Sequence, residues 1–347
     1  MNNLIIIGNG FDLAHKMETS YEQFMKYIID SNGKKVIHKD LFTTNLNLSY
    51  TDLKTTSISY QNSLLQSKSN NQFLKSLFDD LLLKNWCDIE EKYFELLSHV
   101  GKQAALYKNP LTLNSELEII KLHLSEYLKT QEKTASQIDS YKSFFSSIDS
   151  NQTVILNFNY TDTLKRLYSD SLKLSSIIHI HGELDNKTNP IVFGYAATDL
   201  ESRALIDKKN NEYMRNIKKH LYKQAKNEAQ LIKHLIVTKK IDVSILGHSC
   251  GLSDKLILSE ILNHDNVSTI RTFYYENYEN YFNTMVNIDR IMNDDAKFKN
   301  RIIDFNSSPR MPQIEDKELQ ISTFIKYVAE LKNTQNAEKP KRAHISF

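Results

Sequence analysis

Glycine, cysteine and long apolar runs are all scarce in this chain of 347 residues. Its two cysteines, Cys87 and Cys250, have no metal-ligand spacing, which argues against a disulfide framework and for a reducing compartment. No apolar stretch approaches the roughly 20 residues of a membrane-spanning helix. No basic segment precedes the apolar N-terminal run, so we expect no signal peptide, no membrane partner and a cytoplasmic location.

The chain also lacks an excess of charge of either sign. Its formal net charge is only +2, so no global field attracts nucleic acid, and we expect no such partner. Residues 200–240 are rich in lysine, but a run of this kind is usually a solvated helix face. An apolar fraction of 40% is adequate for a buried core. The length suits one large or two modest domains.

The first dozen residues hold the most informative pattern. The apolar run Leu4–Ile7 indicates a strand that is covered on both faces, as in a parallel sheet. It ends in the sequence GNGFD at residues 8–12, where two glycines permit a sharp turn and close approach of a ligand to the backbone. Ligands of open α/β sheets bind at this end of the strands. Leu13 replaces the third glycine of a dinucleotide fingerprint, which disfavours an ordinary NAD dehydrogenase.

Two later strand–turn units lie in the middle of the chain. Residues 153–157 predict a strand that runs into the polar turn FNYTD at residues 158–162. Residues 176–181 predict another, which ends just before Gly182. Strand alternation puts His179 and His181 on the same face of that strand, with His181 at its end. His181 is therefore the better candidate for a functional site, and His179 the better candidate for a core histidine.

A fourth unit joins the predicted strand 243–246 to the loop GHSCGLSD at residues 247–254 and then to a helix. The residues of this loop can bring backbone and hydroxyl groups to a phosphate or ribose. Three further short segments have strand patterns: residues 191–195, 270–275 and 301–305.

Residues 19–150 show helical periodicity and almost no strand signal, so we interpret them as a helical insertion after the first strand. Within it, the polar stretch 39–71 is a long loop, with or without short helices. The sequence WCDIE at residues 86–90 leaves two interpretations open: its acids face water, or Asp88 or Glu90 reaches towards the site.

Strands that alternate with helices predict an α/β fold with a doubly wound, mostly parallel sheet. Residues 1–18 and 151–310 form the predicted nucleotide-binding core. Residues 311–347 form a C-terminal helix and a frayed tail.

Because parallel strands all finish at one edge of a sheet, we expect the polar residues that follow them to converge there. The candidate catalytic residues are His181, Asn159 and Asp12. The candidate ligand-binding residues are Gly8, Asn9, Gly10, Phe11, Tyr160, Asp162, Gly182, Gly247, His248, Ser249 and Asp254.

Three segments together resemble the AbiH-type abortive-infection family, whose members act in bacterial defence against phage. They are IIIGNGFDLAH at residues 5–15, NFNYTDTL at 157–164 with IHIHGEL at 178–184, and ILGHSCGLSD at 245–254. WCDIE also fits that family. The resemblance spans most of the chain except the 39–71 stretch and the tail.

The same segments are more remotely similar to the sirtuin-like NAD-binding fold of other phage-defence proteins. That resemblance implies a sirtuin-like Rossmann core with NAD as substrate or ligand and His181 as the catalytic histidine. It further implies that Gly8, Gly10 and Asp12 line a phosphate and ribose pocket, that Asn159 contacts the nicotinamide ribose, and that Gly247 and Ser249 hold the adenosine side. The chain has no paired zinc-binding cysteines, so a zinc-containing protein deacylase is disfavoured.

Three functions fit these residues. The favoured one is hydrolysis of the nicotinamide–ribose bond of NAD, in which a histidine takes a proton from a ribose hydroxyl or from water and no metal is expected. A metal-dependent phosphohydrolase or nuclease would use Asp12, Asn159, His179, His181 and His248 as ligands. A non-catalytic nucleotide sensor would bind the same small molecule without turnover. The sequence leaves open whether the chain forms a homo-oligomer or answers a phage-derived trigger.

Overall fold

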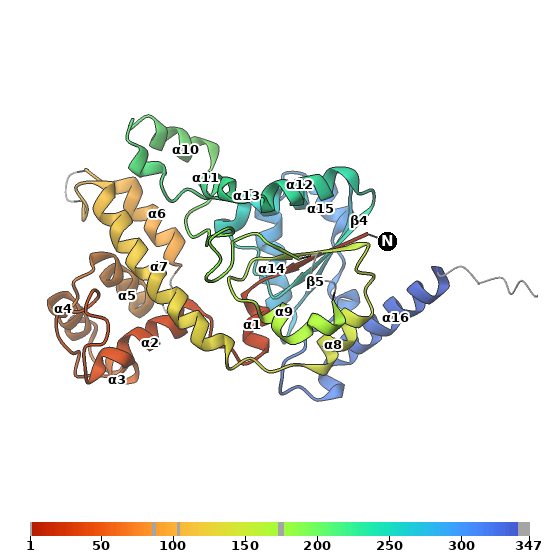
Figure 1. Ribbon diagram of the computed structural model, residues 1–347, viewed down its shortest axis with the longest axis horizontal. Coiled ribbons are helices and arrows are strands. Elements are labelled where there is room, and N and C mark those ends of the chain that lie inside the picture. The colour runs from red at the N-terminus through yellow and green to blue at the C-terminus, as the bar shows by residue number, and fades with distance from the viewer. Residues whose placement is uncertain (1, 85–87, 103–104, 173–176, 339–347) are drawn as a thin grey trace, which may run out of the picture. The chain divides into compact units, whose positions relative to one another are not determined.

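The computed structural model describes residues 2–84, 88–102, 105–172 and 177–338 (Figure 1). Two compact units make up the chain. The core unit comprises Met1–Met17, Thr134–Glu183 and Lys226–Phe347. The helical unit comprises Glu18–Lys133 and Leu184–Ala225. Trp86 and Cys87 of the WCDIE sequence lie outside the described residues, as does the tail from residue 339.

The core unit is built on a sheet of parallel strands, which confirms the predicted α/β class. The described strands follow the order β3-β2-β1-β4-β5. Their bounds are β1 Asn2–Ile7, β2 Thr153–Asn157, β3 Ile177–His179, β4 Ile241–Leu246 and β5 Val267–Phe273. The N-terminal apolar run occupies the central strand, so all four of its side chains are buried.

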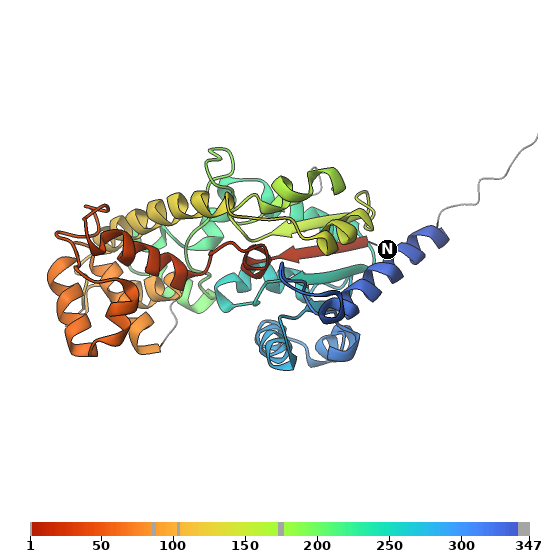
Figure 2. The same ribbon diagram turned by 90° about the horizontal axis from the view of Figure 1, so that it is seen from below.

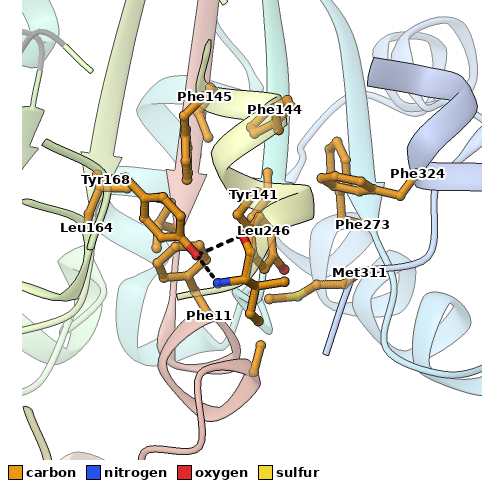
Figure 3. Packing of buried hydrophobic residues seen from close by; sticks show 14 of the residues in the cluster. Phe11, Tyr141, Phe144, Phe145, Leu164, Tyr168, Leu246, Phe273, Met311 and Phe324 are labelled. Carbon is orange, nitrogen blue, oxygen red and sulfur yellow. Dashed lines mark hydrogen bonds between the residues drawn. The ribbon is translucent and has the colours of Figure 1, made fainter. Parts of the chain in front are cut away.

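Helices cover the core sheet on its two faces (Figures 1 and 2). Three helices form one hydrophobic cluster with the sheet: α8 (Asp139–Ser146), α9 (Thr163–Tyr168) and α16 (Ser322–Glu338). Figure 3 shows its aromatic side chains, among them Phe11, Phe144 and Phe324. The other face carries three helices: α12 (Asn227–Val237), α13 (Lys255–Leu262) and α14 (Tyr278–Ile291). The helix α15, Asp295–Arg301, lies against β5.

The helical unit contains most of the predicted insertion. Its helices from the first segment are α2 Tyr21–Gly33, α3 Tyr50–Thr55, α4 Ile58–Lys68, α5 Gln72–Lys84, α6 Ile89–His99 and α7 Pro110–Glu132. The polar 39–71 stretch holds α3 and α4, which the side chains of Ser49 and Ser57 cap at their N-termini. The second segment adds α10, Asp199–Ile206, and α11, Lys218–Leu221.

Two of the predicted strands are wrong. In the segment 191–195, the only bridge is an isolated one from Tyr195 to Ile217, and the N–H of Gly194 donates to the Glu90 carboxylate instead of to a neighbouring strand. In the segment 301–305, Ile302 makes one isolated bridge and a 3-10 turn begins at Phe305. Both are short apolar runs, which periodicity alone does not assign.

Within the helical unit, the two acids of WCDIE have structural contacts. Asp88 caps α6, because its Oδ1 accepts hydrogen bonds from the N–H groups of Glu90 and Glu91. Glu90 is buried and forms an ion pair with Lys218. Among the described residues, no helix is both long and apolar enough to cross a membrane.

Candidate functional site

The carboxyl ends of β1, β2, β3 and β4 lie on one edge of the core sheet, because all of these strands are parallel. Strand order reverses between β1 and β4, since β2 and β3 lie on one side of β1 and β4 and β5 on the other. In open α/β sheets such a reversal marks the usual ligand-binding crevice. The helix α1, Asn9–Ala14, starts directly from β1 at this edge.

Three of the candidate residues meet around one carboxylate. The Nε2 atom of His181 lies 3.1 Å from Oδ1 of Asp254, and the Nε2 atom of His248 lies 3.3 Å from Oδ2 of the same side chain. The exposed fractions of these side chains are 7% for His181, 5% for His248 and 14% for Asp254. Asp254 immediately precedes α13 and thus joins the loop after β4 to the turn after β3.

Contacts at both ring nitrogens hold His248 within this group. The Nδ1 atom of His248 accepts a hydrogen bond of 2.9 Å from the N–H of Cys250, so its neutral tautomer carries the proton on Nε2, which faces Asp254. Both nitrogens of His248 are therefore engaged in holding the loop. The Phe158 ring makes edge contacts with both imidazoles, at centroid distances of 5.0 Å to His181 and 4.3 Å to His248, and Tyr160 stacks on His181.

The glycines at the switch point pack against each other's backbone. A Cβ atom on Gly8 would lie 2.7 Å from the Cα of His248, and one on Gly10 would lie 2.8 Å from the Cα of Gly247. The N–H of Gly10 also donates to the carbonyl of Gly247 at 2.7 Å. On this side of both glycines, the loop after β4 therefore occupies the space through which we expected a ligand to approach the backbone.

Asp12 and Asn159 connect the first two strand ends. Asp12 is 1% exposed and its Oδ2 accepts a hydrogen bond of 2.5 Å from the hydroxyl of Thr161. The side-chain amide of Asn159 donates to the carbonyl of Gly8 at 3.1 Å. These contacts join the turn after β1 to the turn after β2. Phe11, another candidate, is buried in the aromatic cluster of Figure 3.

A second group of charged side chains lies at the ends of β2 and β3. The Nε2 atom of His179 is 3.9 Å from Oδ1 of Asp162 and 3.8 Å from Oε1 of Glu183. The ammonium of Lys165 lies 2.7 Å from the same Glu183 oxygen and 3.5 Å from Asp162. Burial lowers the pKa of His179 to about 4, which keeps its imidazole neutral at pH 7. Gly182, with a φ of 80°, turns the chain between His179 and Glu183.

A family model for bacteriophage abortive infection AbiH proteins matches residues 4–278, which include all of these strand ends. The chain belongs to the AbiH family. No curated protein matches it. The match to AbiH covers the sheet and the helical unit and stops within α14, so α16 lies beyond it.

Two residues of the charged group at the ends of β2 and β3 are not among the candidates that the sequence predicts. Lys165 follows Asp162 by three positions on α9, and Glu183 follows His179 by four. The helical spacing of the first pair is a signal that sequence offers, whereas the second pair meets only because Gly182 reverses the chain. Asn9 and Ser249, two predicted binding residues, are exposed, and the carbonyl of Ser249 accepts a hydrogen bond from Asn287.

Proposed function

We propose that this AbiH protein acts in abortive infection by hydrolysing the nicotinamide–ribose bond of NAD, with His181 as the general base. The observation that carries the proposal is the Asp254 carboxylate that bridges the Nε2 atoms of His181 and His248. A carboxylate on one nitrogen of an imidazole orients the ring and stabilises the imidazolium that forms when the ring takes a proton. Asp254 is therefore a positioning residue for His181.

The location of this group supports a dinucleotide as the substrate. Doubly wound sheets with the order 3-2-1-4-5 bind dinucleotides in the crevice where the strand order reverses. In this chain the reversal lies between β1 and β4, and the loop after β4 carries both His248 and Asp254. A sirtuin-like Rossmann core, in which this edge holds NAD, is part of the proposal.

The reaction requires few catalytic groups from the protein. The bond between the ribose C1′ and the cationic nicotinamide ring breaks, and its electron pair neutralises the ring, so no general acid is needed. A water oxygen forms the new bond to C1′ while His181 takes its proton, directly or through a ribose hydroxyl. His248 holds Asp254 in place, and the Phe158 ring covers one side of each imidazole, which limits the access of bulk water to that side. Depletion of NAD would halt the metabolism of an infected cell.

The test is nicotinamide release from NAD, measured by chromatography, together with the NAD content of phage-infected cells that express the chain. We expect wild type to release nicotinamide and His181→Gln to do so about 10²–10⁴-fold more slowly, the usual loss on removal of a general base. Asp254→Asn should also slow the reaction while the chain stays folded. His220→Gln, at an exposed position of the helical unit, is the matched control.

The infected cells give the deciding result, because they contain whatever trigger the protein needs. Protection against phage with an unchanged NAD content would overturn the hydrolase proposal. If His181→Gln binds NAD and still protects, the chain is a sensor of the nucleotide instead of an enzyme that consumes it.

A further inference from the structure

We propose that Asp162, His179 and Glu183 form a binding site for a divalent transition-metal cation, with Mn²⁺ and Zn²⁺ as its expected occupants. One ligand atom from each residue lies within 4.8 Å of the other two. This site is distinct from the Asp254 group and does not depend on NAD chemistry. It departs from the sequence expectation that no metal is bound.

The two distances from His179 to the carboxylates are close to those between ligands around a common centre. Two atoms that bind one cation at about 2.1 Å each lie roughly 3–4 Å from each other. The Nε2 atom of His179 lies 3.9 Å and 3.8 Å from the oxygens of Asp162 and Glu183. Both distances exceed the roughly 3.2 Å upper limit of an ordinary hydrogen bond. The imidazole therefore faces the two carboxylates without bonding directly to those oxygens.

The fold fixes the three groups from separate elements. Asp162 stands at the N-terminus of α9, His179 ends β3, and Glu183 follows the turn at Gly182. The other ring nitrogen of His179, Nδ1, lies 3.3 Å from the side-chain amide of Asn157, its register partner on β2. The backbone of Asn159 also makes a hydrogen bond with the His179 ring. These contacts hold the ring with Nε2 directed towards the carboxylates, and a metal would bind the tautomer that carries its proton on Nδ1.

The Oδ1 atom of Asp162 and the Nε2 atom of His179 are buried, but the side chains of the three residues differ in exposure. The His179 side chain is 3% exposed, whereas those of Glu183 and Asp162 are 20% and 39% exposed. A cation would thus enter along the carboxylates and meet the imidazole last.

The structure already places a cation against these carboxylates. The ammonium of Lys165 lies 2.7 Å from Glu183 and 3.5 Å from Asp162. We infer that Lys165 neutralises the two carboxylates in the metal-free protein and leaves when a metal binds. Its long side chain is 27% exposed and has room to turn towards solvent. Lys165 and the metal should therefore compete for the same oxygens.

The ligand set selects the class of metal. Imidazole nitrogen suits Zn²⁺ and other transition metals, and carboxylate oxygen suits Mn²⁺ and Mg²⁺. A mixed set of one imidazole and two carboxylates favours Mn²⁺ and Zn²⁺ over Mg²⁺, because Mg²⁺ prefers oxygen ligands and retains most of its water.

The test is titration of the full chain with Mn²⁺, followed by the paramagnetic resonance signal of the free ion, and with Zn²⁺ by calorimetry. We expect one site in wild type. His179→Gln and Glu183→Gln should each weaken it beyond the roughly 10–100-fold cost of losing an outer-shell partner. Lys165→Met should tighten it by about tenfold or more, because a competing positive charge is removed. His123→Gln, which breaks a histidine–carboxylate pair with Asp40 elsewhere, should leave the affinity unchanged.

Circular dichroism establishes whether each variant is folded. If one of the two ligand variants does not fold, the other is sufficient for the test. No binding of Mn²⁺ or Zn²⁺ to folded wild type at millimolar metal would overturn the proposal. Binding that appears only in Lys165→Met would also overturn it, because the lysine would then be the permanent cation. Binding that both ligand variants retain at full affinity would place the metal elsewhere.

Discussion

At the scale of single residues, the turn after β1 depends on glycines because another backbone fills the space beside them. We predict that Gly10→Ala destabilises the protein by several kcal/mol, since its Cβ would lie 2.8 Å from the Cα of Gly247, an atom that cannot move as a side chain can. Gly251→Ala is the matched control. Its Cβ would meet only side-chain atoms at 3.7 Å or more, and its φ of −62° suits any residue. Thermal unfolding of both variants checks the difference, and equal melting temperatures would contradict it.

His15 is a buried histidine whose role is structural. Its ring lies 2.6 Å from the Phe11 carbonyl through Nδ1 and 2.6 Å from the Tyr168 hydroxyl through Nε2. The carbonyl can only accept, so Nδ1 carries the proton and Nε2 accepts from Tyr168. The same hydroxyl accepts a hydrogen bond from the N–H of Ile138. Burial lowers the pKa of His15 to about 4.

This shift predicts a pH dependence of stability. Between pH 6.5 and about 4 the unfolded chain binds a proton on His15 that the folded chain does not, so stability falls as the pH drops through this window. The loss between pH 7 and pH 5 is about 2 kcal/mol for this one group. We expect His15→Gln to be less stable at pH 7 but to lose about 2 kcal/mol less than wild type on going to pH 5. Urea unfolding at the two pH values measures both quantities, and parallel pH profiles would contradict the prediction.

The sequence identified which residues stand at the strand ends but not which of them touch. Parallel strands must finish at one edge, so His181, His248 and Asp254 were predictable as neighbours of that edge. Their shared carboxylate was not predictable, because it depends on the path of the loop between β4 and α13. Asp12 shows the converse: its position was predicted, but its burial against Thr161 follows from packing that no local pattern reveals.

At the scale of elements, a buried ion pair fastens the second segment of the helical unit to α6. Lys218 is 0% and Glu90 is 6% exposed at the side chain, with Nζ and Oε2 2.8 Å apart, and Glu90 also accepts from the N–H of Gly194. Phe94 and Tyr195 stack beside them with ring centroids 3.9 Å apart. These contacts explain why residues 184–225, assigned to the core from sequence, belong to the helical unit. Sequence offers no sign of such a pairing over more than a hundred residues.

We predict that Lys218→Met lowers the stability of the helical unit by about 3–5 kcal/mol, because it leaves the Glu90 charge buried without its cation. The double variant Glu90→Gln with Lys218→Met should recover part of that loss, since glutamine is neutral and keeps an oxygen for Gly194. Hydrogen exchange of the α6 amides measures the change within this unit. If the double variant is the less stable of the two, the buried charge is not the cause.

At the scale of the whole molecule, the order of segments along the chain differs from their arrangement in the fold. The chain forms β1, leaves the core unit after Met17 and returns to it at Thr134. Residues 184–225 then belong to the helical unit again. The alternation of strands and helices was enough to predict the parallel sheet and a large insertion. It was not enough to predict that α8 packs on the core sheet, because an amphipathic helix pattern does not say which surface it covers.

This arrangement makes the first seventeen residues indispensable to a sheet whose other strands come more than a hundred residues later. Since β1 pairs with both β2 and β4, a fragment of residues 134–347 would expose two facing strand edges and the apolar cluster beneath them. We expect this fragment alone to aggregate or to lack a cooperative thermal transition. Coexpression with residues 1–133, which supply β1 as a separate chain, should recover soluble complex in a size-exclusion assay. A monomeric 134–347 fragment with a sharp melting transition would show instead that the remaining strands close the gap by themselves, and that β1 is not the strand on which the sheet depends.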